Sequence, residues 1–374
     1  MEYFYFLILC AFWPVKMIFV YFHSKKDLKN RTPLLPDAVC RKIILKNTNN
    51  GLLWASSQDY TDMWTRDTFF ACFGNPKLQK RMAKKLAAYQ RDDGLIPLYI
   101  GAGDAFRKMY CGQRADGEPE AHYKDAKTGD EPTDSCFQFI IMAYHDYPQK
   151  CKQAWQYMQK YVINGLVMEN GLGTWQDTIK HSGHVTYTNM LYYQATKCVY
   201  PEKCAAIKQK IIQTLWNGKY FVSSTSNGSF GQVDNALALI YEIAPNPSSI
   251  FNIHKAHFDS PFSPPNKMIE DGSKAFGITE VYLPCYPIGN ADYHNGWAWS
   301  WVNLLFIKAK LMYKKRVNIE YYESMLKDYG TLYETYDENG PIQCLLYKSQ
   351  PNFSESCGLF LDVYKKSKGG FLSF

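Results

Sequence analysis

The sequence predicts an all-α fold built from consecutive helical hairpins. Apolar residues recur at helical spacing along most of the chain, and strong period-two alternation, which would mark strands, is scarce. The predicted helices follow one another in pairs joined by short turns marked by Gly and Pro, which suggests a closed toroid or a solenoid. Because the pairs share no fixed sequence repeat, a regular solenoid is disfavoured.

The predicted helices can be justified in chain order. The first, 78–90, is amphipathic and ends at the turn residues 92–94. The second, 135–147, carries a surface of Phe and Ile side chains, and Asp134 is its predicted N-cap. The others follow in pairs, at 150–163, 186–198, 202–216, 234–243, 248–257, 294–313, 319–330 and 352–366.

Composition narrows the classes of function. The chain has 374 residues, of which 16% are aromatic, which predicts a large aromatic core and supplies flat faces for sugar rings. The net charge of +7 is spread over the chain without a long basic block, so we expect no nucleic-acid partner. The 11 cysteines show no zinc spacing, so we expect no metal or cofactor; one or two disulfides remain open.

Residues 1–24 predict a single N-terminal membrane segment. The stretch 3–22 is almost entirely apolar, and about 20 residues suffice to span a bilayer. Basic residues behind it favour a cytosolic domain, whereas three sequons favour export, so the side of the membrane stays open. These sequons begin at Asn30, Asn227 and Asn352. We expect residues 25–36 to be a linker and 37–374 to be one domain.

Two distant acidic segments carry the chemistry that the sequence suggests. Asp177 lies in 173–178 near Trp175, and Glu334 lies in 333–340 beside Tyr333. Two carboxyl groups that flank a glycosidic bond are the minimum needed to cut it. Burial against an aromatic ring raises the pKa of a carboxyl group, as a general acid requires. The sequence therefore predicts a glycan substrate, provided that the fold brings the segments together.

Five segments, in this order, resemble the six-hairpin glycosidases, an (α/α)6-barrel superfamily. Residues 60–69 resemble the family's Trp-x-Arg-Asp-Thr segment, and 89–97 resemble its Gln-x-x-Asp-Gly-Leu-Ile-Pro turn. Among these enzymes, the chain is most similar to the glycogen-debranching amylo-α-1,6-glucosidase and glucoamylase-like group. The other matching segments are 174–177 with 185–193, 233–238, and 295–299 with 333–337.

The resemblance implies a role for each of eight residues. Asp177 would be the general acid and Glu334 the general base of an inverting hydrolase, with carboxyl groups about 6.5–9.5 Å apart. Arg66 and Asp67 would hold sugar hydroxyls, since a guanidinium fork beside a carboxylate suits vicinal hydroxyls. Trp175 would form a wall of low dielectric constant. The expected stacking platforms are Trp64, Trp297 and Trp299.

Plainer interpretations stay open at several of these positions. Asp177 could be a helix N-cap, and Arg66 with Asp67 could be a buried ion pair at a helix start. Trp297 and Trp299 could belong to the core. Glu355, in a segment that relatives fill differently, is the reserve base, while 337–340 has the chemistry of a turn.

The expected activity is exo-acting hydrolysis of α-glucosides. Two alternatives keep the same barrel. The first is a carbohydrate-binding pseudoenzyme without turnover. The second is a phosphorylase or lyase, although a phosphorylase would need an anion site where the water-activating carboxylate Glu334 is expected.

Overall fold

The computed structural model describes residues 31–58, 60–101, 119–125, 129–276, 292–344 and 347–368. The predicted membrane segment 1–24, the first half of the predicted linker (25–30) and Asn30 of the first sequon lie outside these residues. Within the described ranges, every helix is too short or too polar to cross a bilayer. The seven cysteines whose side chains are described are free thiols, and five of them are buried.

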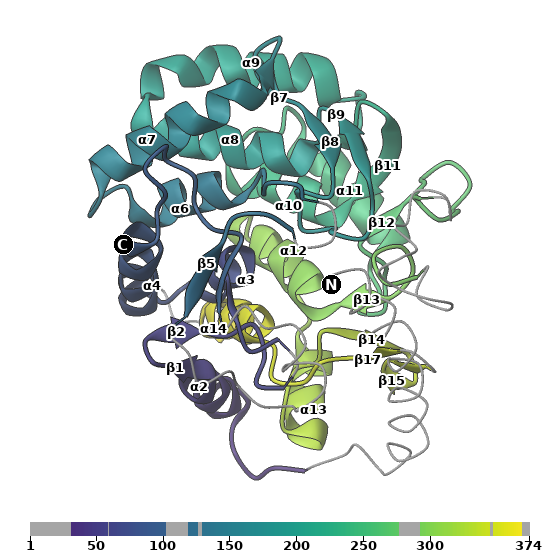
Figure 1. Cartoon of the computed structure of the whole chain (residues 1–374). Helices are drawn as coiled ribbons and strands as arrows, with labels where there is room; N and C mark the ends of the chain where they lie inside the picture. The colour runs from purple at the N-terminus through teal and green to yellow at the C-terminus, as the bar shows by residue number, and fades with distance from the viewer. Residues whose placement is uncertain are drawn as a thin grey trace, which may run out of the picture.

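The described residues form 12 α-helices in two layers (Figure 1). Six inner helices contact one another in sequence, and the last contacts the first, so they close a ring. The inner helices are α3 (Thr65–Ala71), α6 (Ser135–Ala143), α8 (Thr186–Val199), α10 (Gln232–Ile240), α12 (Ser300–Met312) and α14 (Ser354–Ser367). The outer helices are α2 (Pro36–Asn47), α4 (Pro76–Ala88), α7 (Pro148–Met158), α9 (Cys204–Leu215), α11 (Pro247–His257) and α13 (Glu320–Tyr329).

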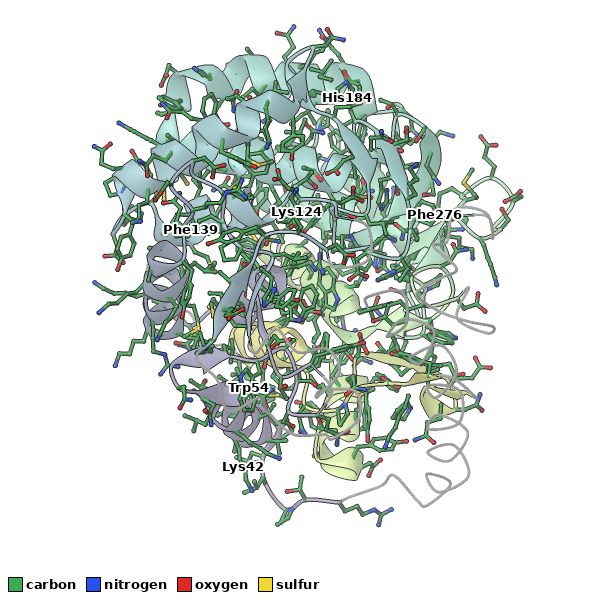
Figure 2. The ribbon with its side chains drawn as sticks, viewed as in Figure 1. Lys42, Trp54, Lys124, Phe139, His184 and Phe276 are labelled. Atoms are coloured by element: carbon green, nitrogen blue, oxygen red, sulfur yellow. The ribbon has the colours of Figure 1, made fainter. Side chains whose placement is uncertain are left out.

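Burial patterns separate the two layers. The outer helix α4 buries one stripe, which includes Leu78, Met82 and Leu86, and exposes its lysines. The inner helix α3 buries all seven of its residues, as a helix packed on every side must. Figure 2 shows side chains filling the space inside the ring and between the layers.

Most predicted helices are confirmed, and the differences have local causes. Helix α2 was not predicted, although Val39, Cys40, Ile43 and Ile44 have helical spacing and lie on its buried side. Helix α3 was not predicted either, because seven residues are too few to show a helical repeat of apolar side chains. Helix α12 begins at Ser300 rather than at residue 294, because the preceding residues form turns and a short strand.

Short antiparallel strands connect the helices. Three sheets have three strands each: β3 (Met63–Trp64), β4 (Tyr99–Gly101) and β5 (Glu120–His122); β10 (Val222–Ser224), β11 (Asn227–Gly231) and β12 (Asn266–Lys267); β13 (Ala298–Trp299), β14 (Thr335–Asp337) and β15 (Gly340–Pro341). The two-stranded sheets are β1 (Thr48–Asn49) with β2 (Leu52–Leu53), β6 (Val162–Ile163) with β7 (Leu166–Val167), β8 (Glu169–Gly171) with β9 (His181–Gly183), and β16 (Gln343–Cys344) with β17 (Tyr347–Lys348). The predicted turn 337–340 joins β14 to β15.

Four inner helices start on backbone contacts from other loops. None of α3, α10, α12 and α14 has a side-chain cap. Their first backbone N–H groups instead donate to loop carbonyl oxygens, which satisfies donors that a helix leaves unpaired. These bonds are Thr65 to Leu98 (3.0 Å), Gln232 to Pro265 (2.8 Å), Ser300 to Glu334 (3.3 Å) and Ser354 to Ala55 (2.8 Å).

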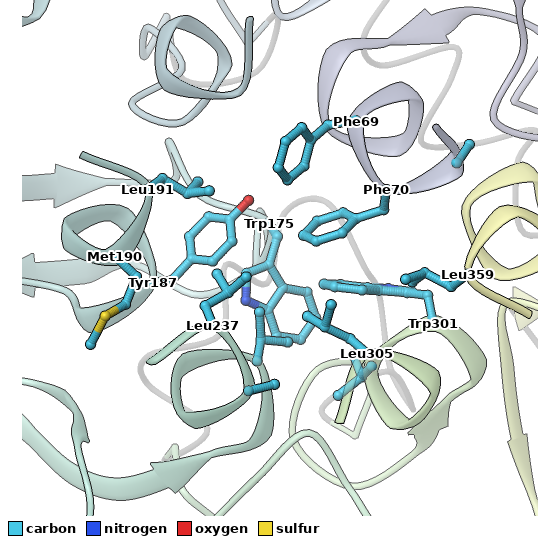
Figure 3. Packing of buried hydrophobic residues seen from close by; sticks show 14 of the residues in the cluster. Phe69, Phe70, Trp175, Tyr187, Met190, Leu191, Leu237, Trp301, Leu305 and Leu359 are labelled. Atoms are coloured by element: carbon cyan, nitrogen blue, oxygen red, sulfur yellow. The ribbon is translucent and has the colours of Figure 1, made fainter. Parts of the chain in front are cut away.

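Trp175 fills the middle of the ring. Figure 3 shows it surrounded by side chains from α3, α8, α10 and α12. Its ring lies 5.0 Å from that of Trp301, in an edge-to-face arrangement, and Trp301 lies 4.6 Å from Phe70. The loop that follows β8 is therefore anchored in the core.

Gly358 allows α14 and α3 to close the ring. A Cβ atom at this position would lie 2.1 Å from the carbonyl oxygen of Ala71, a backbone atom that cannot move aside cheaply. We expect Gly358→Ala to lower the free energy of unfolding by about 1–3 kcal/mol, although alanine favours helix more than glycine does. Chemical denaturation measures this change. Gly228→Ala is the control, because its Cβ would meet open space, and equal stability of the two variants would contradict the close contact.

Candidate active site

The first turns of four inner helices meet at one end of the ring. Arg66 and Asp67 lie in the first turn of α3, Asp134 directly precedes α6, Tyr187 lies in the first turn of α8, and Glu355 in that of α14. All five are buried. The positive end of each helix dipole favours negative charge here, which suits a cluster of carboxyl groups.

Arg66 ties this cluster to the loop of Asp177. Its Nη1 donates to the carbonyl oxygen of Thr174 (2.8 Å) and lies 3.6 Å from Asp134 Oδ2. Its Nη2 lies 3.8 Å from Asp177 Oδ2. Burial disfavours charge on the guanidinium, but the carboxylates of Asp134, Asp177 and Asp67 raise the pKa of Arg66. The predicted Arg66–Asp67 pair is thus part of a wider charge network.

Asp134 has a different role from the one predicted. It lies at the N-cap position of α6, but its side chain caps no backbone N–H group. Its Oδ2 instead accepts a hydrogen bond from the hydroxyl of Tyr187 (3.0 Å) and faces Arg66. Burial raises the pKa of Asp134, and Arg66 and the Tyr187 hydroxyl oppose this rise.

Asp177 lies in a turn, and its side chain is 27% exposed. No helix begins at this position, so the N-cap interpretation of Asp177 is wrong. The side chain therefore lies at the edge of the buried charge network and keeps access to solvent. Such a position suits a group that exchanges protons with a bound molecule.

Glu334 is 1% exposed and both of its carboxyl oxygens accept hydrogen bonds from tyrosines. The Tyr293 hydroxyl donates to Oε1, and the Tyr347 hydroxyl donates to Oε2 (2.9 Å). Burial raises the pKa of Glu334 from 4.5 to about 8, although the two tyrosine hydroxyls oppose the rise. The charge of Asp67 adds to it.

Asp67 interacts electrostatically with both predicted catalytic carboxyl groups, Asp177 and Glu334. Burial raises the pKa of Asp67 to about 6, Arg66 lowers it, and Asp177 raises it further. Burial also raises the pKa of Glu355, as do Asp67 and Glu334. The fold thus brings Asp177, Glu334 and Glu355 to one electrostatic cluster; the distance between the first two stays a prediction.

The four predicted aromatic contacts fall into two classes. Trp64 and Trp297 are half-buried: Trp64 packs on Tyr99 (4.7 Å between centroids), and Trp297 stacks on Tyr347 (4.9 Å). Trp175 and Trp299 are each 5% exposed, and their rings lie edge to face at 5.9 Å. The first pair keeps surface for a ligand, while the second belongs mainly to the core.

Sequence reasoning missed several residues that build the site. Tyr347 lies in β17 of a two-stranded sheet. The sequence of this sheet shows no regular hydrophobic pattern, so the contact between Tyr347 and Glu334 could not be predicted. Tyr293 and His294 directly precede the matched segment 295–299, but neither has a sequence pattern that marks it as a site residue. Thr178 follows Asp177 and shares a hydrogen bond with His294 Nδ1 (2.6 Å).

A separate hollow of about 910 Å³ lies between α11 and α13. Phe251, His254 and Tyr321 line it, together with the basic residues Lys315 and Arg316. Arg66, Asp67, Asp177 and Glu334 are not among its lining residues. This hollow is therefore distinct from the carboxyl cluster.

Glu169 lies behind the loop of Asp177 and is 2% exposed. Its Oε1 accepts hydrogen bonds from the hydroxyls of Thr133 (2.6 Å) and Thr188 (2.5 Å). Burial raises the pKa of Glu169 from 4.5 to about 7, despite these two donors. The folded state therefore prefers the protonated form.

This preference makes stability depend on pH. A raised carboxyl pKa in the folded state gives stability that is present below the unfolded value of 4.5 and is lost as pH rises to about 7. The free energy of unfolding of Glu169→Gln lacks this loss. We therefore expect it to rise by about 3 kcal/mol relative to that of the unsubstituted protein as pH increases from about 4 to about 8. Denaturation at several pH values measures it. The exposed Glu202→Gln is the control, and parallel pH curves for both would refute the assignment.

No protein-family model matches the sequence, and no curated protein matches it. Solved structures do match its fold. A GH63 mannosylglycerate hydrolase from Thermus thermophilus, in complex with glucose, is 12% identical with a TM-score of 0.54, over 88% of this chain and 99% of that one. A glycosidase variant is 11% identical with a TM-score of 0.60, over 89% and 97%. A rhamnosidase from Klebsiella oxytoca with rhamnose bound is 11% identical with a TM-score of 0.53, over 91% and 66%. The chain has the fold of solved glycosidases.

Proposed function

We propose that this protein is an inverting glycoside hydrolase of the (α/α)6-barrel type, exo-acting on α-glucosides. Asp177 is the general acid and Glu334 the general base. The observation that carries the proposal is the convergence of Asp177 and Glu334 on the Arg66–Asp67 pair at one end of the helix ring. The likeness of the fold to solved glycosidases supports it, as does the glucose bound in one of them. The resemblance to the glucoamylase-like group also remains part of the proposal.

The acid step belongs to Asp177. Its partly exposed carboxyl group can reach a glycosidic oxygen at the mouth of the cluster and give it a proton as the bond to the leaving sugar breaks. Arg66 holds the loop through Thr174, which fixes where this carboxyl group lies. Trp175 anchors the same loop in the core. Proton transfer requires such fixed geometry.

The base step belongs to Glu334. As a carboxylate it takes a proton from a water molecule, whose oxygen attacks the anomeric carbon on the face opposite the leaving group. An α-linked glucoside then yields β-glucose. The hydroxyls of Tyr293 and Tyr347 stabilise the carboxylate and orient it. In this proposal Arg66 and Asp67 hold sugar hydroxyls, and Trp64 and Trp297 stack on sugar rings.

One observation favours a second candidate, a carbohydrate-binding pseudoenzyme. Both oxygens of Glu334 are engaged by tyrosines, and burial raises the pKa of Glu334 to about 8. A protonated Glu334 cannot accept a proton from water. A protein that kept Glu334 protonated in the complex with glycan would bind sugar without turnover.

Proton NMR of the purified protein with maltose, isomaltose, trehalose and maltotriose tests the function. We expect β-glucose as the first product, which demonstrates hydrolysis and inversion together. With maltotriose, where the first glucose comes from the non-reducing end, α-glucose as the first product would refute inversion. With trehalose, inversion gives one α-glucose for each β-glucose. Binding of a sugar without release of glucose would favour the pseudoenzyme.

Substitution tests the two catalytic roles. Asp177→Asn and Glu334→Gln keep the size of the side chains but remove the proton donor and acceptor, so each should lower kcat by at least about 10²–10⁴-fold. Asp337→Asn, at the end of β14, is the control and should keep full activity. Steady-state kinetics on the substrate found by NMR measures these changes. A larger loss in Glu355→Gln than in Glu334→Gln would make Glu355 the base.

The pH dependence of activity follows from the charge state of Glu334. A base with a raised pKa is active only above that pKa, so we expect kcat/KM to rise with pH through about pH 8. Burial and the charge of Asp67 raise the pKa of Glu334, while hydrogen bonds from Tyr293 and Tyr347 lower it. Tyr347→Phe should therefore move the rise to higher pH. A rise that stays in place would show that another group limits the rate.

We also propose that residues 1–24 anchor the protein in a membrane, with the domain on the cytosolic side. The side-chain amide of Asn227 donates to the carbonyl oxygen of Ala275 (2.8 Å), and that of Asn352 donates to Ser57 Oγ (2.8 Å). A glycan on either amide would disturb these bonds, so these two sequons give little support to export. Protease treatment of sealed membranes tests the orientation.

A further inference from the structure

Two adjacent residues contact both halves of the proposed machinery. The Tyr293 hydroxyl donates to Glu334 Oε1, and the next residue, His294, shares a hydrogen bond with Thr178, the neighbour of Asp177. Tyr293 is 4% exposed, His294 is 2% exposed and Thr178 is 1% exposed. The path from one carboxyl group to the other is therefore short and buried.

We propose that Tyr293–His294 is a positioning unit that couples the loop of Asp177 to Glu334 and sets the separation of the two carboxyl groups. The inference rests on the proposed function for its catalytic meaning. The coupling itself is a property of the fold and can be measured without turnover.

The unit is rigid because tryptophans enclose it. The His294 ring lies parallel to Trp299 (5.0 Å, 11°) and perpendicular to Trp175 (5.3 Å, 88°). Trp299 Nε1 donates to the backbone carbonyl oxygen of Tyr293 (2.7 Å). The histidine therefore cannot turn without disturbing the two tryptophans, and the peptide that carries Tyr293 is held by the same group.

This rigidity has a consequence for the reaction. An inverting enzyme needs room for one water molecule between the base and the sugar, so the separation of its carboxyl groups decides the outcome. A displacement of about 1 Å can cost about 100-fold in rate. The separation depends on the contacts that hold Asp177 and Glu334 in place. Those contacts are made by Thr178, His294 and Tyr293, which are therefore positioning residues.

The experiment follows the pKa of Glu334 in the purified full chain. Carbon-13 NMR of glutamate-labelled protein reports each carboxyl group, and the Glu334 signal is the one absent from Glu334→Gln. Tyr293→Phe removes one donor to the carboxylate and should raise the pKa of Glu334 by about one pH unit. Thr178→Val, which is nearly isosteric and touches neither carboxyl group in this scheme, should also raise it.

Three comparisons decide the result. In a protein that already carries Tyr293→Phe, Thr178→Val should raise the pKa of Glu334 by less than it does alone, because both substitutions act through the same contacts. Thr178→Ser keeps the hydroxyl and should restore the original pKa. Thr196→Val is the control and should change nothing, because Thr196 is a buried residue near the C-terminal end of α8 that accepts a hydrogen bond from Trp155 of the outer helix α7. Thr178→Ala replaces Thr178→Val if the valine variant does not fold.

An unchanged pKa of Glu334 in the Thr178 variants would overturn the proposal, as would additive effects of the two substitutions. If the protein hydrolyses a sugar, Thr178→Val should also lower kcat by about 10–100-fold with little change in KM. If no sugar is hydrolysed, the proposed function fails, while the pKa measurement still decides whether Tyr293–His294 couples the two sites.

Discussion

The structure depends on how its inner helices begin. Their first turns are buried, so water cannot satisfy the first backbone N–H groups, and none of the six has a side-chain cap. For α3, α10, α12 and α14, loops from elsewhere in the chain supply the carbonyl oxygens, including that of Glu334 for α12 and that of Ala55 for α14. These loops are therefore fixed at one end of the ring. Because the same end carries the positive ends of the helix dipoles, the contacts that complete the helices also place carboxyl groups where their charge is best tolerated.

Trp175 connects this site to the stability of the ring. Its side chain occupies the centre of the inner helices, while the residues that follow it carry Asp177 and Thr178 to the charge network. A bulky aromatic group in a core fixes the loop from which it comes, since removing it would leave a large cavity. The position of the proposed acid thus depends on core packing as much as on Arg66. The low exposure of Trp175 and Trp299 fits this structural role, and it leaves Trp64 and Trp297 as the aromatic groups with surface to offer.

The sequence could predict the elements whose signal is local. Long amphipathic helices such as α4 show their period directly, whereas α3 has seven buried residues and no polar face to mark it. Asp177 and Glu334 could be proposed from the sequence because each lies in a matched segment near aromatic residues. Their partners could not, because a hydrogen bond such as that from Tyr347 to Glu334 joins residues whose sequence surroundings carry no pattern. Asp134 shows the opposite error: its position at a helix start suggested a cap, and only the fold shows that Arg66 competes for it.

The carboxyl groups of the site cannot be understood one at a time. Asp67 raises the pKa of both Glu334 and Glu355, and Glu334 raises that of Glu355, so protons bind to the group as a whole rather than to any single residue. Arg66 opposes this at Asp67, and two tyrosines oppose it at Glu334. The charge on the base therefore depends on residues that need not touch it. Glu334 raises the pKa of Glu355. Because an interaction between two charges is reciprocal, an ionised Glu355 disfavours charge on Glu334 whether or not it contacts the sugar.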